Sequence, residues 1–307
     1  MSIRFSILIP AYNRERYVAQ AIDSVLSQTF TDHEILVVDD GSTDNTLKVL
    51  ESYGARIRVL RQSNRGPEVA RNTAAGVAKG EYLVLLDSDD LLLPNALMTY
   101  DRIIRQFDSP PVIIGALMNF SDQEPLRSGS ELPGPVRILK FMDYLSKDVP
   151  LQVSSSRIVL KKSAFDEVGG LRNTTPNTFH LDSLNLILRV GTYSPCIVVR
   201  APGTVGYRRH QGNTIRQVKQ IAQGIHVLAC AERSGQYPGG KKRSFERRAL
   251  IGSLALSWSV SQGLRRGRLF VVLRLLIDTW PMVFAAFAKK ARSYSQEHTS
   301  EILVSDT

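Results

Sequence analysis

The chain has 307 residues, of which 43% are hydrophobic and 22% are charged, and its formal net charge is +10. These proportions are those of an ordinary globular protein, and a chain of this length can bury a sizeable core. Its two cysteines, Cys196 and Cys230, offer neither a disulfide framework nor metal-ligand spacing, so we expect two buried thiols in a reducing cytoplasm.

The positive charge is concentrated toward the C-terminus. Between Lys241 and Arg292 there are twelve basic residues and two acidic ones, so this segment carries the net charge and the remainder is close to neutral. A nucleic-acid enzyme is expected to carry its basic face around the working cleft. A basic appendage instead favours an anionic membrane surface as a partner and argues against nucleic acid.

The first hundred residues alternate between strand and helix patterns. The first apolar run is too short for an export signal and ends at Pro10, so we interpret it as a buried strand. Apolar helical spacing predicts helices over Tyr17–Leu26 and from Pro67 to a C-cap at Gly80. The four predicted strands are Phe5–Pro10, Ile35–Val38, Ile57–Leu60 and Tyr82–Leu86. Such alternation predicts a doubly wound α/β sheet, with its ligand site beyond the carboxyl ends of the strands.

The remaining elements are less regular. Ser121 to Pro135 is rich in Ser, Pro, Gly and Glu and is expected to be a loop that ends the first half. Beyond Asn213 the pattern is wholly helical. The predicted elements between residues 95 and 209 are helix Asn95–Phe107, strand Val112–Leu117, strand Val153–Leu160, helix Ser163–Val168, turn Gly169-Gly170, helix Asp182–Val190, and strands Ile197–Arg200 and Val205–Arg209.

A polar run follows the second strand and must form a loop. It reads Asp39-Asp40-Gly41-Ser42-Thr43-Asp44. Gly41 permits a sharp turn, and Ser42 or Asp44 is interpreted as a cap of the next helix. Capping does not explain Asp39 and Asp40. A carboxylate at this strand end can accept hydrogen bonds from a base or a sugar.

An acidic run, Asp87-Ser88-Asp89-Asp90, follows the fourth strand. Three carboxylates this close repel one another unless a cation or strong donors lie among them. Mg²⁺ prefers oxygen ligands and typically uses one or two carboxylates together with substrate phosphates. An acidic surface turn before a helix is the alternative. The position at the same sheet edge as Asp39 favours a metal site.

Four motifs, in this order, resemble those of family-2 glycosyltransferases of the GT-A fold. They are Phe5-Ser6-Ile7-Leu8-Ile9-Pro10-Ala11-Tyr12-Asn13, the Asp39–Asp44 run, Asn64-Arg65-Gly66 with Ala70-Arg71-Asn72, and Leu86-Asp87-Ser88-Asp89-Asp90. The resemblance implies an α/β, Rossmann-like nucleotide-diphospho-sugar transferase sheet with a C-terminal helical extension. The implied division is a nucleotide-sugar-binding half over 1–118, an acceptor-binding half over 119–215 and a basic helical extension over 216–307.

The resemblance also implies donor-binding residues. Pro10, Ala11 and Tyr12 would line the pocket for the base and ribose, and Asp39 would hydrogen-bond the base, usually uracil. Arg71 would lie near the nucleotide or the carboxylates. The implied reaction transfers a sugar, with inversion, from a nucleoside diphosphate donor, favouring a UDP-sugar, to a saccharide or lipid-linked acceptor.

The acidic run would bind the donor sugar and, through a metal ion, the diphosphate. Asp87 and Ser88 would approach the ribose and the donor sugar, and Asp89 would bind a Mn²⁺ or Mg²⁺ cofactor that bridges the diphosphate. The segment Tyr207–Asn213 resembles the closing Arg-x-His segment of the family, which makes His210 a candidate metal ligand or diphosphate contact. A structural hydrogen bond is the alternative role for His210.

The likeness loosens on the acceptor side. Gly169-Gly170-Leu171 and Leu186-Ile187-Leu188-Arg189 match the family pattern, but the Glu-Asp pair between them is altered. Depending on one inserted residue, Asp182 takes the place of either acid. Asp182 is the only acid between Glu167 and Glu232, so we predict that it is the general base, with a helix N-cap as its alternative role.

The apolar segment Leu269–Ala288 is long enough to suggest a membrane span, but Arg274, Asp278 and Pro281 interrupt it. Because basic residues flank the segment, we predict an interfacial amphipathic helix pair and a cytoplasmic protein that lies peripherally on the inner face of the cell membrane. Protein packing, including a dimer interface, and a true span are the alternatives. The basic tail is also what suggests a lipid-linked or cell-envelope acceptor.

Two other functions compete with sugar transfer. A sugar nucleotidyltransferase has a related sheet but needs a glycine-rich phosphate loop directly after the first strand, and Ala11-Tyr12-Asn13-Arg14 is not such a loop. A nucleotide-sugar-binding pseudoenzyme is the second alternative, because the Glu-Asp pair is altered.

Overall fold

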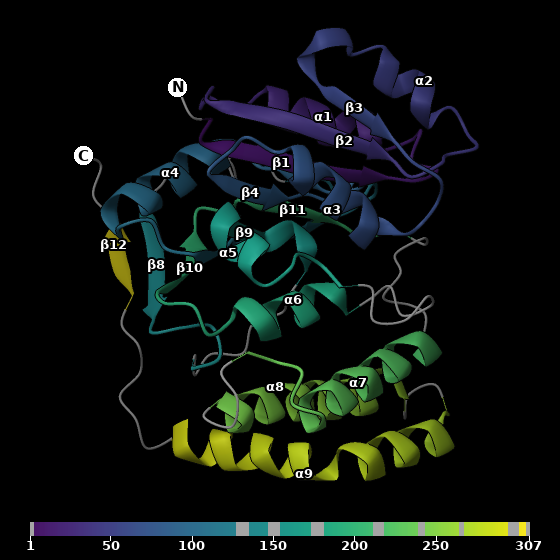
Figure 1. Cartoon of the computed structure of the whole chain (residues 1–307), viewed down its shortest axis with the longest axis vertical. Coiled ribbons are helices and arrows are strands. Elements are labelled where there is room, and N and C mark those ends of the chain that lie inside the picture. The colour runs from purple at the N-terminus through teal and green to yellow at the C-terminus, as the bar shows by residue number, and fades with distance from the viewer. Residues whose placement is uncertain are drawn as a thin grey trace.

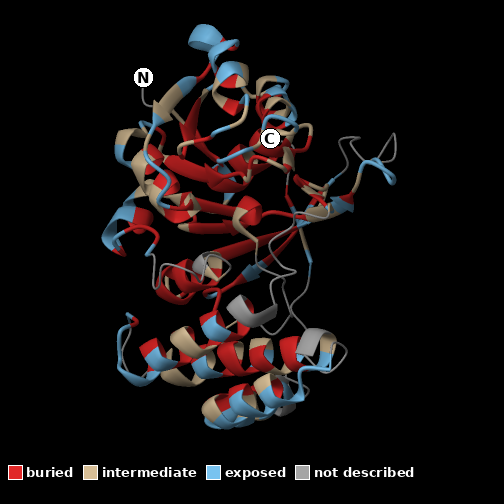
Figure 2. Cartoon of the chain, turned by 90° about the vertical axis from the view of Figure 1, so that its right-hand side faces the viewer, coloured by how far each residue is buried: buried red, intermediate tan, exposed pale blue. Residues whose placement is uncertain are grey.

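A nine-stranded mixed sheet forms the body of the molecule, and a layer of three helices lies against one end of it (Figure 1). The computed structural model describes residues 3–126, 135–146, 154–172, 181–210, 218–238, 243–263, 267–293 and 301–304. The predicted α/β sheet with a C-terminal helical extension is confirmed. Figure 2 shows that the inner strands of the sheet are buried, whereas exposed residues gather on the outer helices, the loops and the edge strand β3.

Four parallel strands form one half of the sheet, in the order β4-β1-β2-β3. Their bounds are β1 Phe5–Ala11, β2 His33–Asp39, β3 Arg58–Arg61 and β4 Tyr82–Leu85. Strands β1 and β4 are buried along their whole length, which explains why they are apolar without alternation. Ala11 pairs with Asp39, so the segments that follow β1 and β2 leave the sheet side by side.

Beyond β4 the order is β4-β9-β6-β10-β8-β12, and the neighbours pair antiparallel except β6 and β10, which are parallel. The predicted strand over Val112–Leu117 is two strands in different sheets, and β9 starts five residues later than predicted because Ser155–Arg157 form a 3₁₀ turn. The bounds are β6 Val112–Ile114, β7 Leu117–Phe120, β8 Val136–Phe141, β9 Ile158–Lys161 and β10 Cys196–Ala201.

A small three-stranded sheet, β5-β11-β7, lies beyond the carboxyl end of β4. Strand β5 is Leu91–Leu92 and β11 is Val205–Arg208. Because β5 directly follows the acidic run and β11 pairs with it, residues near 208 lie close to that run. Strand β7 runs across residues 118 and 119, where we predicted that the nucleotide-sugar-binding half would end. The division into a nucleotide-sugar-binding half, an acceptor-binding half and a basic helical extension stays a prediction.

Helices cover both faces of the large sheet. On one face, α1 and α4 pack in one hydrophobic cluster, and on the other α3, α5 and α6 pack in a second. The bounds are α1 Val18–Leu26, α2 Thr46–Glu51, α3 Pro67–Val77, α4 Ala96–Gln106, α5 Lys162–Glu167 and α6 Asp182–Val190. Helix α6 has the predicted bounds, whereas α3 is capped at Ala78 and not at Gly80.

The C-terminal extension consists of α7 (Val218–Arg233), α8 (Ser244–Trp258) and α9 (Leu269–Ser293). The chain then returns to the sheet edge, where β12 (Ile302–Val304) pairs antiparallel with β8, so the prediction of a wholly helical C-terminus is wrong. By length and composition, α9 is the one described helix that could cross a membrane. Cys196 is buried as predicted, but Cys230 is exposed on α7.

Gly80 is required for close contact between its loop and β1. A Cβ at this position would lie 2.4 Å from the backbone nitrogen of Ser6, in β1, which is paired on both sides. We expect Gly80→Ala to lower the free energy of unfolding by about 1–3 kcal/mol, because the strand must shift. In chemical denaturation, the control Gly76→Ala should be neutral or stabilising, since open space surrounds that helical position. Equal effects of both substitutions would contradict the explanation.

Candidate active site

The ends of β1, β2 and β4 bring the polar runs of the sequence together at one edge of the sheet. The backbone N–H of Asp40 donates to the carbonyl of Ala11 at 2.8 Å, and that of Leu86 donates to Leu8 at 3.1 Å. Tyr12, just beyond β1, is 42% exposed. An open aromatic side chain therefore lies at the same edge as the carboxylates.

The two acids that end β2 have different environments. Asp39 is fully buried, and its Oδ1 accepts the N–H of Ser42 at 3.0 Å while its Oδ2 lies 3.3 Å from Arg61 Nε. Asp40 accepts three hydrogen bonds that hold the loop before α3, from the donors Gln62 Nε2, Arg65 N and Gly66 N. The carboxylate of Asp40 is therefore used within the protein, and Asp39 is the better candidate to contact a ligand.

The predicted helix caps in this loop are only partly present. Asp44 accepts the N–H of Thr46, the first residue of α2, at 2.9 Å. Ser42 does not bond the helix and instead accepts the N–H of Asn13 at 3.0 Å. Asp44 also accepts the N–H of Glu15 at 3.2 Å. These bonds connect the loop after β2 to the loop after β1, which fixes the two segments relative to each other.

The acidic run after β4 forms one cluster. Asp87, Asp89 and Asp90 each place a carboxylate oxygen within 4.8 Å of the others. Asp87 pairs with Arg71 of α3, and Asp89 Oδ2 lies 3.0 Å from His210 Nε2 and 3.7 Å from Arg14 Nε. Hard oxygen ligands at this spacing, with an imidazole beside them, suit Mg²⁺ or Mn²⁺. The residues present therefore fit the predicted metal.

The protein environment affects the three carboxyl groups differently. Burial raises the pKa of Asp90 well above its usual value, and the charges of Asp87 and Asp89 raise it further. Burial also raises the pKa of Asp87 against the opposing effect of Arg71, although 30% of this side chain is exposed and solvent weakens the shift. For Asp89, burial is outweighed by the hydrogen bond from His210 and the charge of Arg14, so its pKa is lowered. Asp89 is thus the member held most firmly as a carboxylate.

Arg208 connects the cluster to three other elements. Its Nε donates to the carbonyl of Asp89 at 2.9 Å, and its backbone N–H donates to Asp90 at 3.0 Å. The guanidinium also donates to Asp122 and Gln20, and it lies between the aromatic rings of Tyr17 and Phe120. These contacts set the position of the segment that ends in His210.

Burial raises the pKa of the neighbouring Tyr207 to about 12, and the charges of the three acids contribute. The Tyr207 phenol therefore stays protonated at neutral pH and can act as a hydrogen-bond donor.

Two serines before β9 connect the cluster to α6. Ser156 accepts the N–H of Asp87 at 3.1 Å and donates to Asp90 at 2.6 Å. The hydroxyl of its neighbour Ser155 lies 2.7 Å from the hydroxyl of Ser183 in α6. Asp182, the predicted base, is the first residue of α6 with Leu181 at the N-cap position, and its side chain lies outside the described part of the chain. The start of α6 is thus tied to the acidic cluster.

Several other motif residues have structural roles. Asn72 exchanges two hydrogen bonds with the backbone of Leu171, at 2.7 and 2.9 Å, and so holds the Gly169-Gly170 turn against α3. Arg189 is buried and donates to the carbonyl of Val168 at 2.7 Å. Residues 127–134 and 173–180, which belong to the predicted acceptor-binding half, lie outside the described part of the chain.

The predicted site residues form two groups along the sheet edge. One group follows β1 and β2 and consists of Pro10, Ala11, Tyr12 and Asp39. The other lies around the acidic run and consists of Arg71, Asp87, Ser88, Asp89 and His210. Sequence reasoning missed Arg14 and Ser156. Arg14 directly follows the Phe5–Asn13 motif, and this position could have indicated that it belongs to the site. Ser156 lies in an ordinary serine run, and its role depends on contacts with residues 66 and 69 positions away.

The comparisons with known proteins agree with this geometry. The model of the family described as "Glycosyl transferase family 2" matches residues 6–169. GlyG, a glycosyltransferase of Streptococcus pneumoniae, is 36% identical over 128 residues, which are 40% of this chain and 42% of that protein. The chondroitin synthase of Escherichia coli is 46% identical over 95 residues, 30% of this chain and 14% of that enzyme. The chain thus matches less than half of the length of these relatives.

Among solved structures, S. aureus TarS (residues 1–349) has a TM-score of 0.67. It is 17% identical, and the alignment covers 95% of this chain and 89% of that chain. At this identity the likeness concerns the fold, which includes the helices that follow the sheet.

Ser156 provides a test of how the cluster is held. We expect Ser156→Ala to lower the free energy of unfolding by about 1–3 kcal/mol, because the buried carboxylate of Asp90 loses its hydroxyl donor. Ser154→Ala is the matched control, since the Ser154 hydroxyl has no hydrogen-bond partner among the described residues. Denaturant titration of both variants is the measurement. A Ser156 variant as stable as the Ser154 variant would argue against this role.

Proposed function

This chain belongs to glycosyl transferase family 2, and on that premise we propose that it transfers a sugar from a nucleoside diphosphate donor to a hydroxyl group of its acceptor. The observation that carries the proposal is the convergence of Asp87, Asp89 and Asp90 with the ends of β1 and β2 at one sheet edge. Such an edge offers a base pocket and a diphosphate site side by side. TarS has been solved with UDP and with UDP-GlcNAc, which supports a UDP-sugar as donor.

The donor would lie along this edge. The exposed ring of Tyr12 would stack on the base, with Pro10 and Ala11 beneath the ribose, and buried Asp39 would hydrogen-bond the base. Arg71 contributes an Nε–H that has no partner among the described residues. Together with Asp87 and Ser88, it would contact the ribose and the donor sugar.

Asp89 and His210 would hold a Mn²⁺ or Mg²⁺ ion next to the diphosphate, where the ion neutralises charge on the leaving group. The 3.0 Å distance between Asp89 Oδ2 and His210 Nε2 supports this pair, because an ion that replaces the shared proton would meet both ligand atoms. His210 is held by stacking on Tyr17, with ring centroids 5.1 Å apart, and by the fixed backbone at Arg208. These contacts orient the imidazole before any ligand binds.

Asp182 would act as the general base. The acceptor oxygen attacks C1 of the donor sugar, the bond from C1 to the phosphate oxygen breaks, and the acceptor proton passes to the Asp182 carboxylate. The contact between the Ser183 and Ser155 hydroxyls supports this role, since the adjacent Ser156 hydrogen-bonds Asp87 and Asp90 and so connects the start of α6 to the acidic cluster. One displacement of this kind inverts the configuration at C1.

The acceptor is proposed to be a saccharide or a lipid-linked saccharide of the cell envelope, with the reaction in the cytoplasm or at the inner face of the cell membrane. A nucleotide-sugar-binding protein without transfer activity is the competing function. An Asp182→Asn variant that loses transfer but keeps donor binding favours the enzyme.

Metal-dependent donor binding is the first test. In a thermal-shift screen, saturating UDP with Mn²⁺ should raise Tm by about 4 °C, and EDTA should abolish the shift. We expect Asp89→Asn to weaken binding about 10–100-fold, whereas exposed Asp32→Asn should leave it unchanged. A shift of the same size in EDTA, or an unaffected Asp89 variant, would remove the metal from the proposal. No shift with any nucleotide sugar would contradict the transferase function.

Transfer itself is tested at Asp182. We expect Asp182→Asn to lower kcat about 10²–10⁴-fold while donor affinity is retained, because the acceptor proton loses its base. Asp166→Asn on α5, an exposed position, is the matched control. The anomeric proton of the wild-type product, observed by NMR, should report inversion. Unchanged turnover in the Asp182 variant would assign the base to another group, and a product with retained configuration would exclude a single displacement.

A further inference from the structure

The outer side of α9 exposes a continuous row of large apolar side chains. Each is at least half exposed, and together they form what we call the α9 stripe: Phe270, Leu273, Ile277, Trp280, Phe284 and Phe287. Their spacing of three and four residues places them on one side of the helix. Figure 1 shows α9 as the outermost layer of the helical extension, farthest from the sheet. An apolar row of this length on a surface indicates a binding partner.

The inner side of α9 packs against the rest of the protein. Val272, Leu275 and Met282 are buried, and α8 approaches so closely at Gly252 that a Cβ there would lie 2.0 Å from the Met282 carbonyl. Asp278 Oδ2 lies 3.1 Å from His226 Nδ1 of α7. If α9 crossed a bilayer, this packed side would have to leave α8, and the Asp278–His226 contact would have to break. The helix therefore has one free side and does not suit a span.

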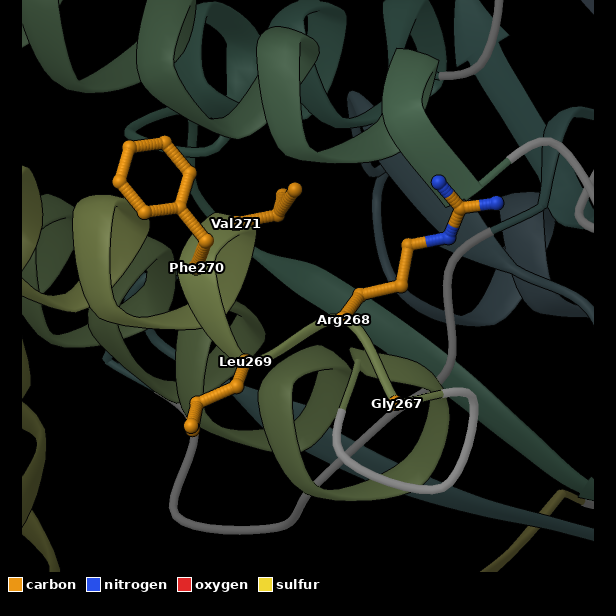
Figure 3. Close-up of a pocket in the computed structure, with 5 residues that line it drawn as sticks. All are labelled: Gly267, Arg268, Leu269, Phe270 and Val271. Atoms are coloured by element: carbon orange, nitrogen blue, oxygen red, sulfur yellow. The ribbon is translucent and has the colours of Figure 1, made fainter.

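Basic residues lie beside the α9 stripe. Arg268 and Arg274 are exposed beside it. The three acids of α7–α9 are all paired with bases, Glu232 with Arg247, Glu246 with Arg243 and Asp278 with His226. An open hollow of about 330 Å³ lies at the start of α9, lined by residues 267–271, and Figure 3 shows the side chains of Arg268 and Phe270 pointing in different directions. A cation and an aromatic ring in this arrangement suit the boundary between headgroups and acyl chains.

We propose that the α9 stripe lies in the interface of an anionic lipid bilayer, with α9 parallel to the membrane plane. The stripe would enter the acyl boundary while Arg268 and Arg274 contact the phosphates. A second copy of the chain is the less suitable occupant, because two such faces would bring two strongly basic extensions together. This proposal concerns where the protein works and does not depend on the transfer reaction.

Vesicle binding by the full chain tests the proposal directly. The chain should co-sediment with vesicles of phosphatidylglycerol and phosphatidylcholine and bind pure phosphatidylcholine at least tenfold more weakly. The two tryptophans provide a second measurement, since Trp258 is buried and Trp280 is 65% exposed. Binding should shift the emission to shorter wavelength, and brominated lipids should quench it, because Trp280 enters the bilayer.

Phe284→Glu is the decisive variant, and Leu303→Glu is its matched control. The two positions are 67% and 65% exposed, and each substitution adds one negative charge, but Leu303 lies on β12 at the sheet edge. We expect Phe284→Glu to lower vesicle partitioning roughly tenfold or more, with Tm unchanged, and Leu303→Glu to leave it within about twofold. If Phe284→Glu lowers Tm, the double variant Arg268→Glu, Arg274→Glu takes its place, with reduced partitioning into anionic vesicles as the expected result.

Three outcomes would overturn the proposal. Equal losses in Phe284→Glu and Leu303→Glu would mean that the stripe is not the contact. A wild-type dimer that Phe284→Glu dissociates, combined with no vesicle binding, would assign the stripe to a second copy. Membrane-bound protein that resists alkaline extraction would assign α9 as a span.

Discussion

Mutual repulsion among three carboxylates is the constraint on which the site depends. Asp87, Asp89 and Asp90 lie within 4.8 Å of one another, and two effects reduce their repulsion: each has a partner from elsewhere in the chain, and the raised pKa of Asp90 favours its neutral form. Asp87 has Arg71, Asp89 has His210 and Arg14, and Asp90 has the Ser156 hydroxyl and the backbone N–H of Arg208. The cluster therefore exists only when α3, the loop after β1, the turn before β9 and the end of β11 are all in place.

This dependence explains why so many polar residues near the site are engaged within the protein. Asp40 holds the loop before α3, and Asn72 with Arg189 holds the Gly169-Gly170 turn. They are buried or partly buried and each makes hydrogen bonds to the backbone of another segment, so they hold these loops in place. The side chains that remain open at the sheet edge, above all Tyr12, can then contact a ligand without a large loss of conformational entropy.

The helical extension likewise has one side that packs within the protein and one side that is exposed. The inner side of α9 packs on α8 and α7, and the outer side presents the α9 stripe beside basic residues. Two contacts hold the extension against the sheet body: an ion pair between Arg243 and Asp143, and a hydrogen bond from Lys289 to the carbonyl of Leu145. A membrane contact at α9 would consequently orient the whole molecule, including the acidic cluster.

By itself, the sequence determined the parallel half of the sheet and the edge at which the site forms. Buried parallel strands are apolar without interruption, and the runs that follow β1, β2 and β4 are locally distinctive, so both could be recognised from neighbouring residues alone. The tertiary structure decided the rest. It split Val112–Phe120 between two sheets, returned the C-terminal segment to the edge as β12, and brought Ser156 and Arg208 to acids 66 and 118 residues away. Contacts over such separations leave no periodic pattern in the chain, because they depend on how packed layers meet and not on the order of adjacent residues.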